Sequence, residues 1–132
     1  MRKVLCWEEN GRVLRQFVAS VAAAPAIVEE SALPAEQWRD AWRLAGGTVV
    51  VDMAAARDIH RARLAGVAAA LLIAADNDLA RAEDGGDAAE VAALRQRRVA
   101  LRAVASDPSI DAAATPSELA AVWPPVLGDR PE

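Results

Sequence analysis

Several residue types that build chemical sites are scarce in this sequence. Cys6 is its only cysteine and His60 is its only histidine. A single thiol excludes an intrachain disulfide and a cysteine-rich zinc site, and one imidazole without histidine or cysteine companions forms no zinc motif. We therefore expect no cofactor or metal. Cys6 is expected to be a small core residue on a strand, and His60 a packing or hydrogen-bonding residue rather than a functional one.

Large apolar side chains are also few. The chain of 132 residues has no tyrosine, one phenylalanine and four tryptophans, although 54% of it is hydrophobic. Alanine supplies much of that fraction and buries little area per residue. The length suits one small domain with a real but thin core, so a partner or self-association is expected to complete the burial.

Excess positive charge and long apolar runs are missing as well. The net charge is −4 and the sequence pI is near 5.0, which argues against a general nucleic-acid binder. The richest apolar run, residues 64–75, is shorter than the ~18 residues that a membrane span requires. Glu8 and Glu9 interrupt the apolar start, so no secretory signal is expected.

No pattern of an active site appears either. Neither Gly46-Gly47 nor Gly85-Gly86 is followed by a Lys-Ser/Thr pair or lies in a GxGxxG frame, so neither predicts a phosphate loop. The acidic residues between 76 and 87 lack the alternating ligands and closing glutamate of a calcium loop. We interpret them as a solvated, helix-capping cluster, and we expect no enzymatic activity.

The first 51 residues are predicted to be β-rich. Two apolar, β-branched runs at 3–8 and 12–19 flank Asn10-Gly11, a dipeptide typical of two-residue hairpin turns. A connection at 21–25, a third strand at 26–29 and a strong strand at 48–51 follow. Alternation places Val4 and Cys6 on one face and Leu5 and Trp7 on the other, and leaves open which face is buried.

Trp38 and Trp42 lie four residues apart before the last of these strands. On a single helical turn this spacing stacks both indoles on one side. Two interpretations stay open, a pair that fills the core and a pair that binds a partner.

Residues 52–105 are predicted to form an antiparallel helical hairpin. Asp52 is the expected N-cap of a helix that runs to Ala82 without proline, and Asp87 with Glu90 begins the second helix after a tight turn. One apolar stripe follows the first helix with partly heptad spacing, which is compatible with a short coiled coil: Leu64, Ala68, Leu71, Leu72, Ala75, Leu79 and Ala82.

The second helix has its own stripe, Val91, Leu94, Leu101 and Val104, interrupted by Arg98. Four arginines, Arg95, Arg97, Arg98 and Arg102, lie on and beside it, opposite Asp76 and Asp78. We expect them to cover the apolar seam with solvated head groups.

The C-terminal region is predicted to close the fold. Pro108 ends the second helix, and Thr115, Pro116 and Glu118 begin a short one in the preferred way. Residues 106–124 are therefore expected to form a clasp anchored by Trp123, and residues 125–132 a flexible tail.

The predicted fold class is thus α+β, a small N-terminal antiparallel sheet followed by a long helical hairpin and a short C-terminal helix. Residues 1–51, 52–105, 106–124 and 125–132 are its expected divisions. The candidate interface residues are Trp38, Trp42, Leu64, Leu71, Leu72, Leu79, Leu94, Arg98, Leu101 and Trp123.

Three blocks of the sequence carry a resemblance to a known family. They are residues 38–42 (WRDAW), residues 51–61 (VDMAAARDIHR), and residues 107–124, with DPSIDAA, TPSEL and the closing WP. In this order, and over residues 25–124, they resemble a family of small, poorly characterised proteins encoded among the tail genes of tailed bacteriophages and prophages. The chain departs from that family's pattern in its alanine-rich first helix and in residues 125–132.

The resemblance implies a genomic setting, the tail fibre, the tail tip or their assembly. It leads us to expect a non-enzymatic structural protein in the virion tail. Such a protein would bind other tail proteins of the fibre or baseplate, and would form a homo-oligomer, with a trimer as one option because fibres are usually threefold. The alternative is a tail-fibre assembly chaperone that is absent from the mature virion. Neither nucleic acid nor a membrane is an expected partner.

Overall fold

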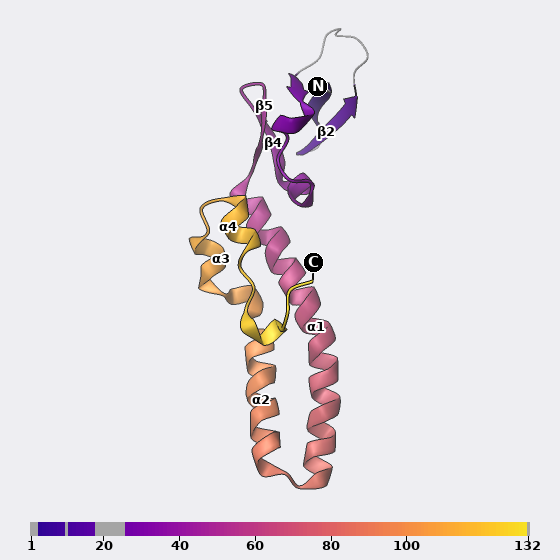
Figure 1. Cartoon of the computed structure of the whole chain (residues 1–132), viewed down its shortest axis with the longest axis vertical. Coiled ribbons are helices and arrows are strands. Elements are labelled where there is room, and N and C mark those ends of the chain that lie inside the picture. The colour runs from indigo at the N-terminus through magenta and orange to yellow at the C-terminus, as the bar shows by residue number, and fades with distance from the viewer. Residues whose placement is uncertain (1–2, 10, 18–25, 132) are drawn as a thin grey trace. The chain divides into compact units, whose positions relative to one another are not determined.

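The computed structural model has the α+β fold that the sequence predicts, with strands first and helices after them (Figure 1). It describes residues 3–9, 11–17 and 26–131. The chain divides into two compact units, residues 1–59 and 60–132. The predicted division at Val51 therefore falls earlier than the observed one, because the first turns of the long helix belong with the strands.

The first sheet has three antiparallel strands in the order β2-β1-β3. They are β1 (Lys3–Glu9), β2 (Arg12–Phe17) and β3 (Ala26–Glu29). Glu9 pairs with Arg12, so two residues separate the paired positions, as the predicted turn requires. Gly11 has a φ of 73°. The predicted hairpin and third strand are confirmed, whereas the connection predicted at 21–25 lies outside the described residues.

The second sheet is a two-stranded hairpin of β4 (Trp42–Ala45) and β5 (Thr48–Val51). Its turn residues Gly46 and Gly47 have φ values of 58° and 83°, a conformation that glycine adopts without steric cost. The strand β5 was predicted, but β4 was not. The single helical turn expected over both tryptophans ends at Ala41 as a 3-10 helix, η2 (Glu36–Ala41), because Trp42 pairs with Val51 instead.

The core of this unit settles which sheet face is buried. Val4, Cys6 and Val13 are fully enclosed, together with Trp38 and Trp42. Cys6 is thus a core residue on a strand, as predicted, and burial raises the pKa of its thiol. The side chains of Leu5 and Trp7, expected on the other face, lie outside the described part of the chain.

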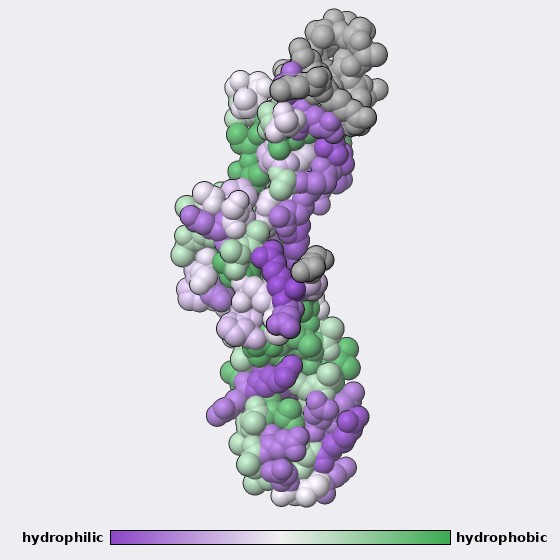
Figure 2. Space-filling model, in the orientation of Figure 1, coloured by the Kyte–Doolittle hydropathy of each residue, from purple (hydrophilic) through white to green (hydrophobic). Residues whose placement is uncertain are grey.

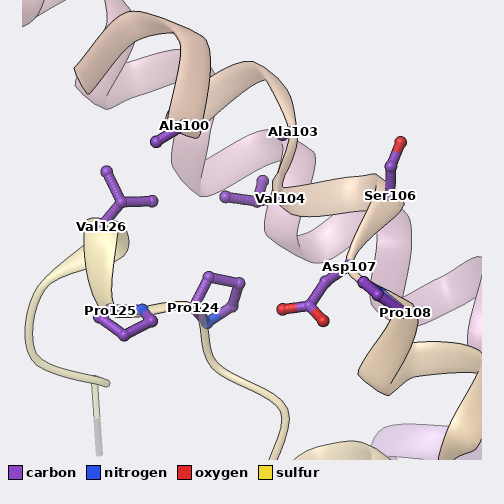
Figure 3. A pocket seen from close by; sticks show the side chains of 9 residues that line it. All are labelled: Ala100, Ala103, Val104, Ser106, Asp107, Pro108, Pro124, Pro125 and Val126. Carbon is purple, nitrogen blue, oxygen red and sulfur yellow. The ribbon is translucent and has the colours of Figure 1, made fainter. Parts of the chain in front are cut away.

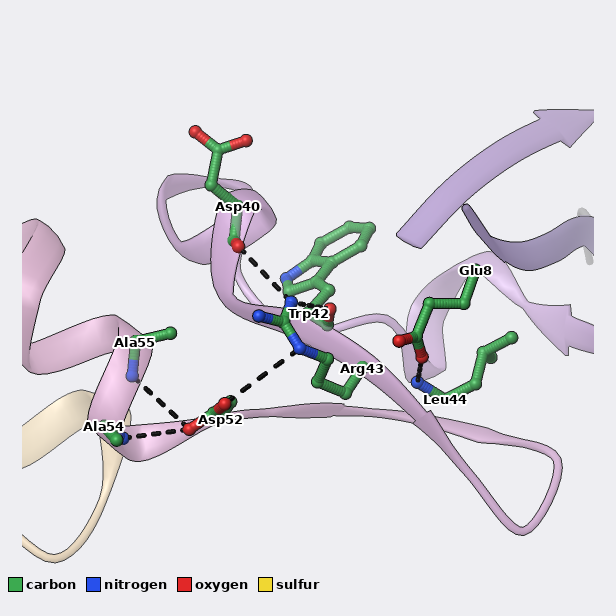
Figure 4. A network of polar contacts seen from close by, with 8 residues as sticks. All are labelled: Glu8, Asp40, Trp42, Arg43, Leu44, Asp52, Ala54 and Ala55. Atoms are coloured by element: carbon green, nitrogen blue, oxygen red, sulfur yellow. Dashed lines mark hydrogen bonds and ion pairs between the residues drawn. The ribbon is translucent and has the colours of Figure 1, made fainter. Parts of the chain in front are cut away.

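A polar network joins the second hairpin to the start of helix α1 (Figure 4). An oxygen of Asp52 accepts hydrogen bonds from the backbone N–H groups of Ala54 and Ala55 at 3.0 and 3.3 Å. The Arg43 guanidinium lies 4.0 Å from the Asp52 carboxylate and donates to the carbonyl of Trp42 at 2.7 Å. The predicted N-cap is confirmed, and it is held in place from the β4 side.

The second unit is dominated by the predicted helical hairpin. Helix α1 (Met53–Gly85) is longer than expected by three residues. Helix α2 (Ala88–Arg102) is capped by Asp87, whose carboxylate accepts a hydrogen bond from the Glu90 N–H at 3.1 Å. Between them Gly86 has a φ of 71°. The turn therefore uses the residue type that its backbone requires.

Short helices follow α2. They are α3 (Pro108–Ala112) and α4 (Pro116–Ala120), with 3-10 turns at Val104–Ser106 and Pro125–Leu127. The Thr115 cap of α4 is confirmed, but α3, which Asp107 caps, was not predicted. Helix α2 was expected to continue to Ala105 and to stop at Pro108, and it instead ends at Arg102, before the 3-10 turn. The expected tail also differs, because its first residues form a turn in which Leu127 is buried.

Candidate interaction surface

Most of the predicted stripe of α1 is buried. The buried members from α1 are Leu64, Ala68, Ala75, Leu79 and Ala82, and α2 contributes Leu101. Three candidate interface residues, Leu64, Leu79 and Leu101, are therefore inside the unit and present no surface to a partner. Leu71, Leu72 and Leu94 are half-buried. These three remain available at the edges of the seam.

Ion pairs cross the two helices beside this seam. Arg98 lies 2.7 Å from the Asp76 carboxylate, and Arg95 lies 3.2 Å from that of Glu83. Arg97 and Arg102 are exposed and make no ion pair with another described residue. The four arginines were expected to lie over the apolar seam with solvated head groups. Two of them, Arg95 and Arg98, instead form ion pairs with acidic residues of α1.

Two large apolar residues face outward from the hairpin. The side chains of Ile73 and Val99 are 66% and 67% exposed. Ile73 lies 12 residues before Gly85, and Val99 lies 12 residues after Asp87. The two residues are therefore at about the same distance from the turn along the two antiparallel helices. Figure 2 shows hydrophobic residues at the surface of the middle of the hairpin, interrupted by hydrophilic ones. Sequence reasoning missed both residues, because they fall off the apolar stripes.

An apolar recess adjoins the end of α2 (Figure 3). It measures about 440 Å³, and its walls are alanine and valine of α2 and the following turn on one side and the prolines of the C-terminal turn on the other. Pro124, Pro125 and Val126 face Ala100 and Val104 across it. Pro125 and Val126, which were predicted to belong to the tail, thus line one wall of a surface hollow together with Pro124 of the predicted clasp.

His60 connects α1 to the C-terminal clasp. Its side chain is 4% exposed, and its Nε2 donates a hydrogen bond to the Val122 carbonyl at 2.8 Å. Burial lowers the pKa of His60 from the ordinary value of 6.5, the hydrogen bond to the Val122 carbonyl opposes this, and the charges of Arg63 and Arg130 add to the lowering. The imidazole is therefore neutral at pH 7 and acts as the predicted hydrogen-bonding residue.

The three tryptophans among the candidates have different places. Trp38 and Trp42 are 1% and 0% exposed inside the N-terminal unit, so the interpretation as a core pair is correct and they do not form a partner-binding surface. Trp123 is half-buried, and its indole N–H donates to the Gly128 carbonyl at 2.8 Å. It therefore fastens the C-terminal turn within the clasp.

Within the described residues, no group of three or more His, Cys, Asp or Glu side chains is placed to hold a metal ion. No helix in that part of the chain combines the length and apolarity of a membrane span. Comparison with protein-family models, with curated proteins and with solved structures found no match.

Proposed function

We propose that this chain is a non-enzymatic structural protein of a phage tail, which associates with the tail fibre or the baseplate and tail-tip region through its helical hairpin. The hairpin supports this proposal because it is a two-helix layer that leaves Ile73 and Val99 exposed and Leu71, Leu72 and Leu94 half-exposed. A single pair of helices covers one side of each helix only, so a further layer gains apolar contact from these residues. The three sequence blocks that resemble tail-region proteins supply the setting.

Mass spectrometry of purified virions tests the proposal. We expect the chain in mature particles at a fixed ratio to a fibre or baseplate protein. Its absence from virions, combined with its recovery on fibres from infected-cell lysate, would select the assembly chaperone instead. Absence from both samples would refute a tail role altogether.

Self-association of the hairpin belongs to the same proposal. In a dimer or a trimer, the hairpin of another copy can pack over the exposed side chains of Ile73 and Val99. Light scattering of the purified chain measures its mass in solution. We expect Ile73→Ser with Val99→Ser to lower that mass or to release the fibre partner, and a chain that is monomeric and still binds fibres with both substitutions would refute the hairpin as the surface.

A further inference from the structure

The strand β5 forms an outer edge of the N-terminal unit. Within the described chain it pairs with β4 only, from Thr48 opposite Ala45 to Val51 opposite Trp42. Figure 1 shows β5 at the margin of this unit, with no other strand of the unit beyond it on that side. The backbone groups on its outer side therefore have no neighbouring strand to bond.

The backbone groups at this edge belong to Val49 and Val51. On the β4 side, Asp52 donates its N–H to the Ala41 carbonyl at 2.8 Å. Successive residues of a strand direct their N–H and C=O groups to alternate sides, so Val50 bonds toward β4 while Val49 and Val51 direct theirs outward. No described residue forms a hydrogen bond with these outward groups. Each of the two residues thus offers one donor and one acceptor.

The opposite edge of the same hairpin is closed. On β4 the Trp42 N–H donates to the Arg39 carbonyl. The Leu44 N–H donates to the Glu8 carboxylate at 3.3 Å (Figure 4). Sheets in native proteins protect their edges in this way, with charged side chains or covering segments. The outer edge of β5 has neither a charged residue nor a described residue bonded to it.

The distribution of charge favours a second copy of β5 as the occupant. The sequence of β5, Thr-Val-Val-Val, carries no charge. The other outer strands differ, because β2 carries Arg12 and Arg15 and β3 carries Glu29. Pairing of β2 or β3 with its own copy brings like charges together, which destabilises an antiparallel pair, whereas two copies of β5 bring none together.

We propose that the chain pairs with a second copy of itself through β5, antiparallel and about a two-fold axis at Val50. Val49 then lies opposite Val51 of the second copy, and each such pair exchanges two hydrogen bonds. The two Val50 side chains contact each other in the non-bonded pair between them, which covers a residue that is 41% exposed in the single chain. Asp52 falls opposite the neutral Thr48, about 13 Å along the strands from the other Asp52.

This pairing goes beyond the proposed function, because it uses the N-terminal unit and neither Ile73 nor Val99. Two strands of four residues bury less than the roughly 1,000 Å² of a stable interface, so the pair is weak by itself. We expect a dissociation constant of about 0.1–1 mM. Any other contact that holds two copies together raises the effective concentration of the strands and strengthens the pairing.

Amide exchange measured by NMR on the full, isotope-labelled chain tests the pairing. The measurement is made with Ile73→Ser and Val99→Ser as background, so that association through these residues does not contribute. Between about 20 μM and 1 mM chain, exchange should slow at least about twofold at Val49 and Val51. It should stay constant at Val50, whose N–H is directed toward β4 at every concentration.

Lysine substitutions at two positions of β5 test the register. Val50→Lys places two positive charges opposite each other at the axis, so it should weaken pairing about tenfold or more. Thr48→Lys adds the same charge opposite Asp52 of the second copy, so it should leave pairing unchanged or strengthen it. Both residues are exposed in the single chain, and circular dichroism checks that each variant is folded.

Disulfide formation measures the same register without lysine at the axis. Cys6 is buried, so Val50→Cys supplies the accessible thiol. Non-bonded neighbours in an antiparallel pair have Cα atoms about 4.5 Å apart, which a disulfide can bridge, so air oxidation should yield a covalent dimer. Thr48→Cys is the matched control, because its two thiols lie about 13 Å apart along the strands and should form far less dimer.

Three results would overturn the proposal. They are exchange rates at Val49 and Val51 that do not change up to about 1 mM, equal effects of the two lysine variants, and equal yields of covalent dimer from the two cysteine variants. Slower exchange that appears only after a purified fibre or baseplate protein is added would assign the edge to that protein, and would likewise refute the pairing of two copies.

Discussion

Leu101 is the residue of α2 on which the hairpin seam depends most. Its side chain is 1% exposed, and it lines a small hollow of about 190 Å³ together with Ala68 and Leu72 of α1. Leu101→Ala removes its buried carbons and enlarges that hollow. The alanine side chains around the hollow are too short to move into the enlarged void. We therefore expect Leu101→Ala to lower the free energy of unfolding by about 3–4 kcal/mol, near the middle of the range for buried leucines.

Urea unfolding followed by the helical signal in circular dichroism measures this loss. Val99→Ala is the matched control, since it shortens an apolar side chain of the same helix that is 67% exposed. It should change the unfolding free energy by less than ~0.5 kcal/mol. A cost below about 1 kcal/mol for Leu101→Ala, or equal costs for the two variants, would show that the seam does not stabilise the hairpin as described.

Three further predictions concern single side chains. Because the folded pKa of His60 is lowered from 6.5, the unfolded chain binds a proton that the folded chain does not, so the free energy of unfolding should fall as the pH drops below about 6.5. His60→Gln, which can still donate to Val122, should flatten that dependence between about pH 7.5 and 5.5 in urea titrations, and an unchanged slope would contradict it. Asp52→Ala should cost about 1 kcal/mol through the lost cap while Asp52→Asn costs less, which thermal unfolding of the pair would compare. Gly86→Ala should cost about 1 kcal/mol because φ is 71°, whereas Gly85→Ala, inside α1, should be neutral or stabilising, and the reverse order would be inconsistent with the turn.

Local signals in the sequence were sufficient for the starts of helices α1, α2 and α4. Asp52, Asp87 and Thr115 each cap the helix that follows, because a cap acts on backbone N–H groups two or three residues away. The turns at Gly11 and Gly86 were equally local, since a positive φ favours glycine whatever surrounds it. These elements were predictable because the interactions that stabilise them span a few residues.

Features that depend on distant contacts were not predictable in the same way. Trp42 begins a strand because it pairs with Val51, and that partner outweighs the helical spacing of the two tryptophans. Leu127 is buried in a turn that composition alone marked as a tail. The recess in Figure 3 requires the end of α2 and the C-terminal turn, which are about 20 residues apart in sequence, to lie side by side. No local pattern contains that information.

Ile73 and Val99 are hard to explain by the stability of the hairpin itself. At an exposed helical position, valine and isoleucine favour the helix less than alanine does, by a few tenths of a kcal/mol. The sequence around them is rich in alanine, and both side chains are about two-thirds exposed. Neither residue therefore strengthens the hairpin that carries it, and their large apolar side chains gain free energy only when another surface covers them. Substitutions at Ile73 and Val99 should therefore weaken association while leaving the unfolding free energy nearly constant, whereas substitutions at Leu101 should lower the unfolding free energy first.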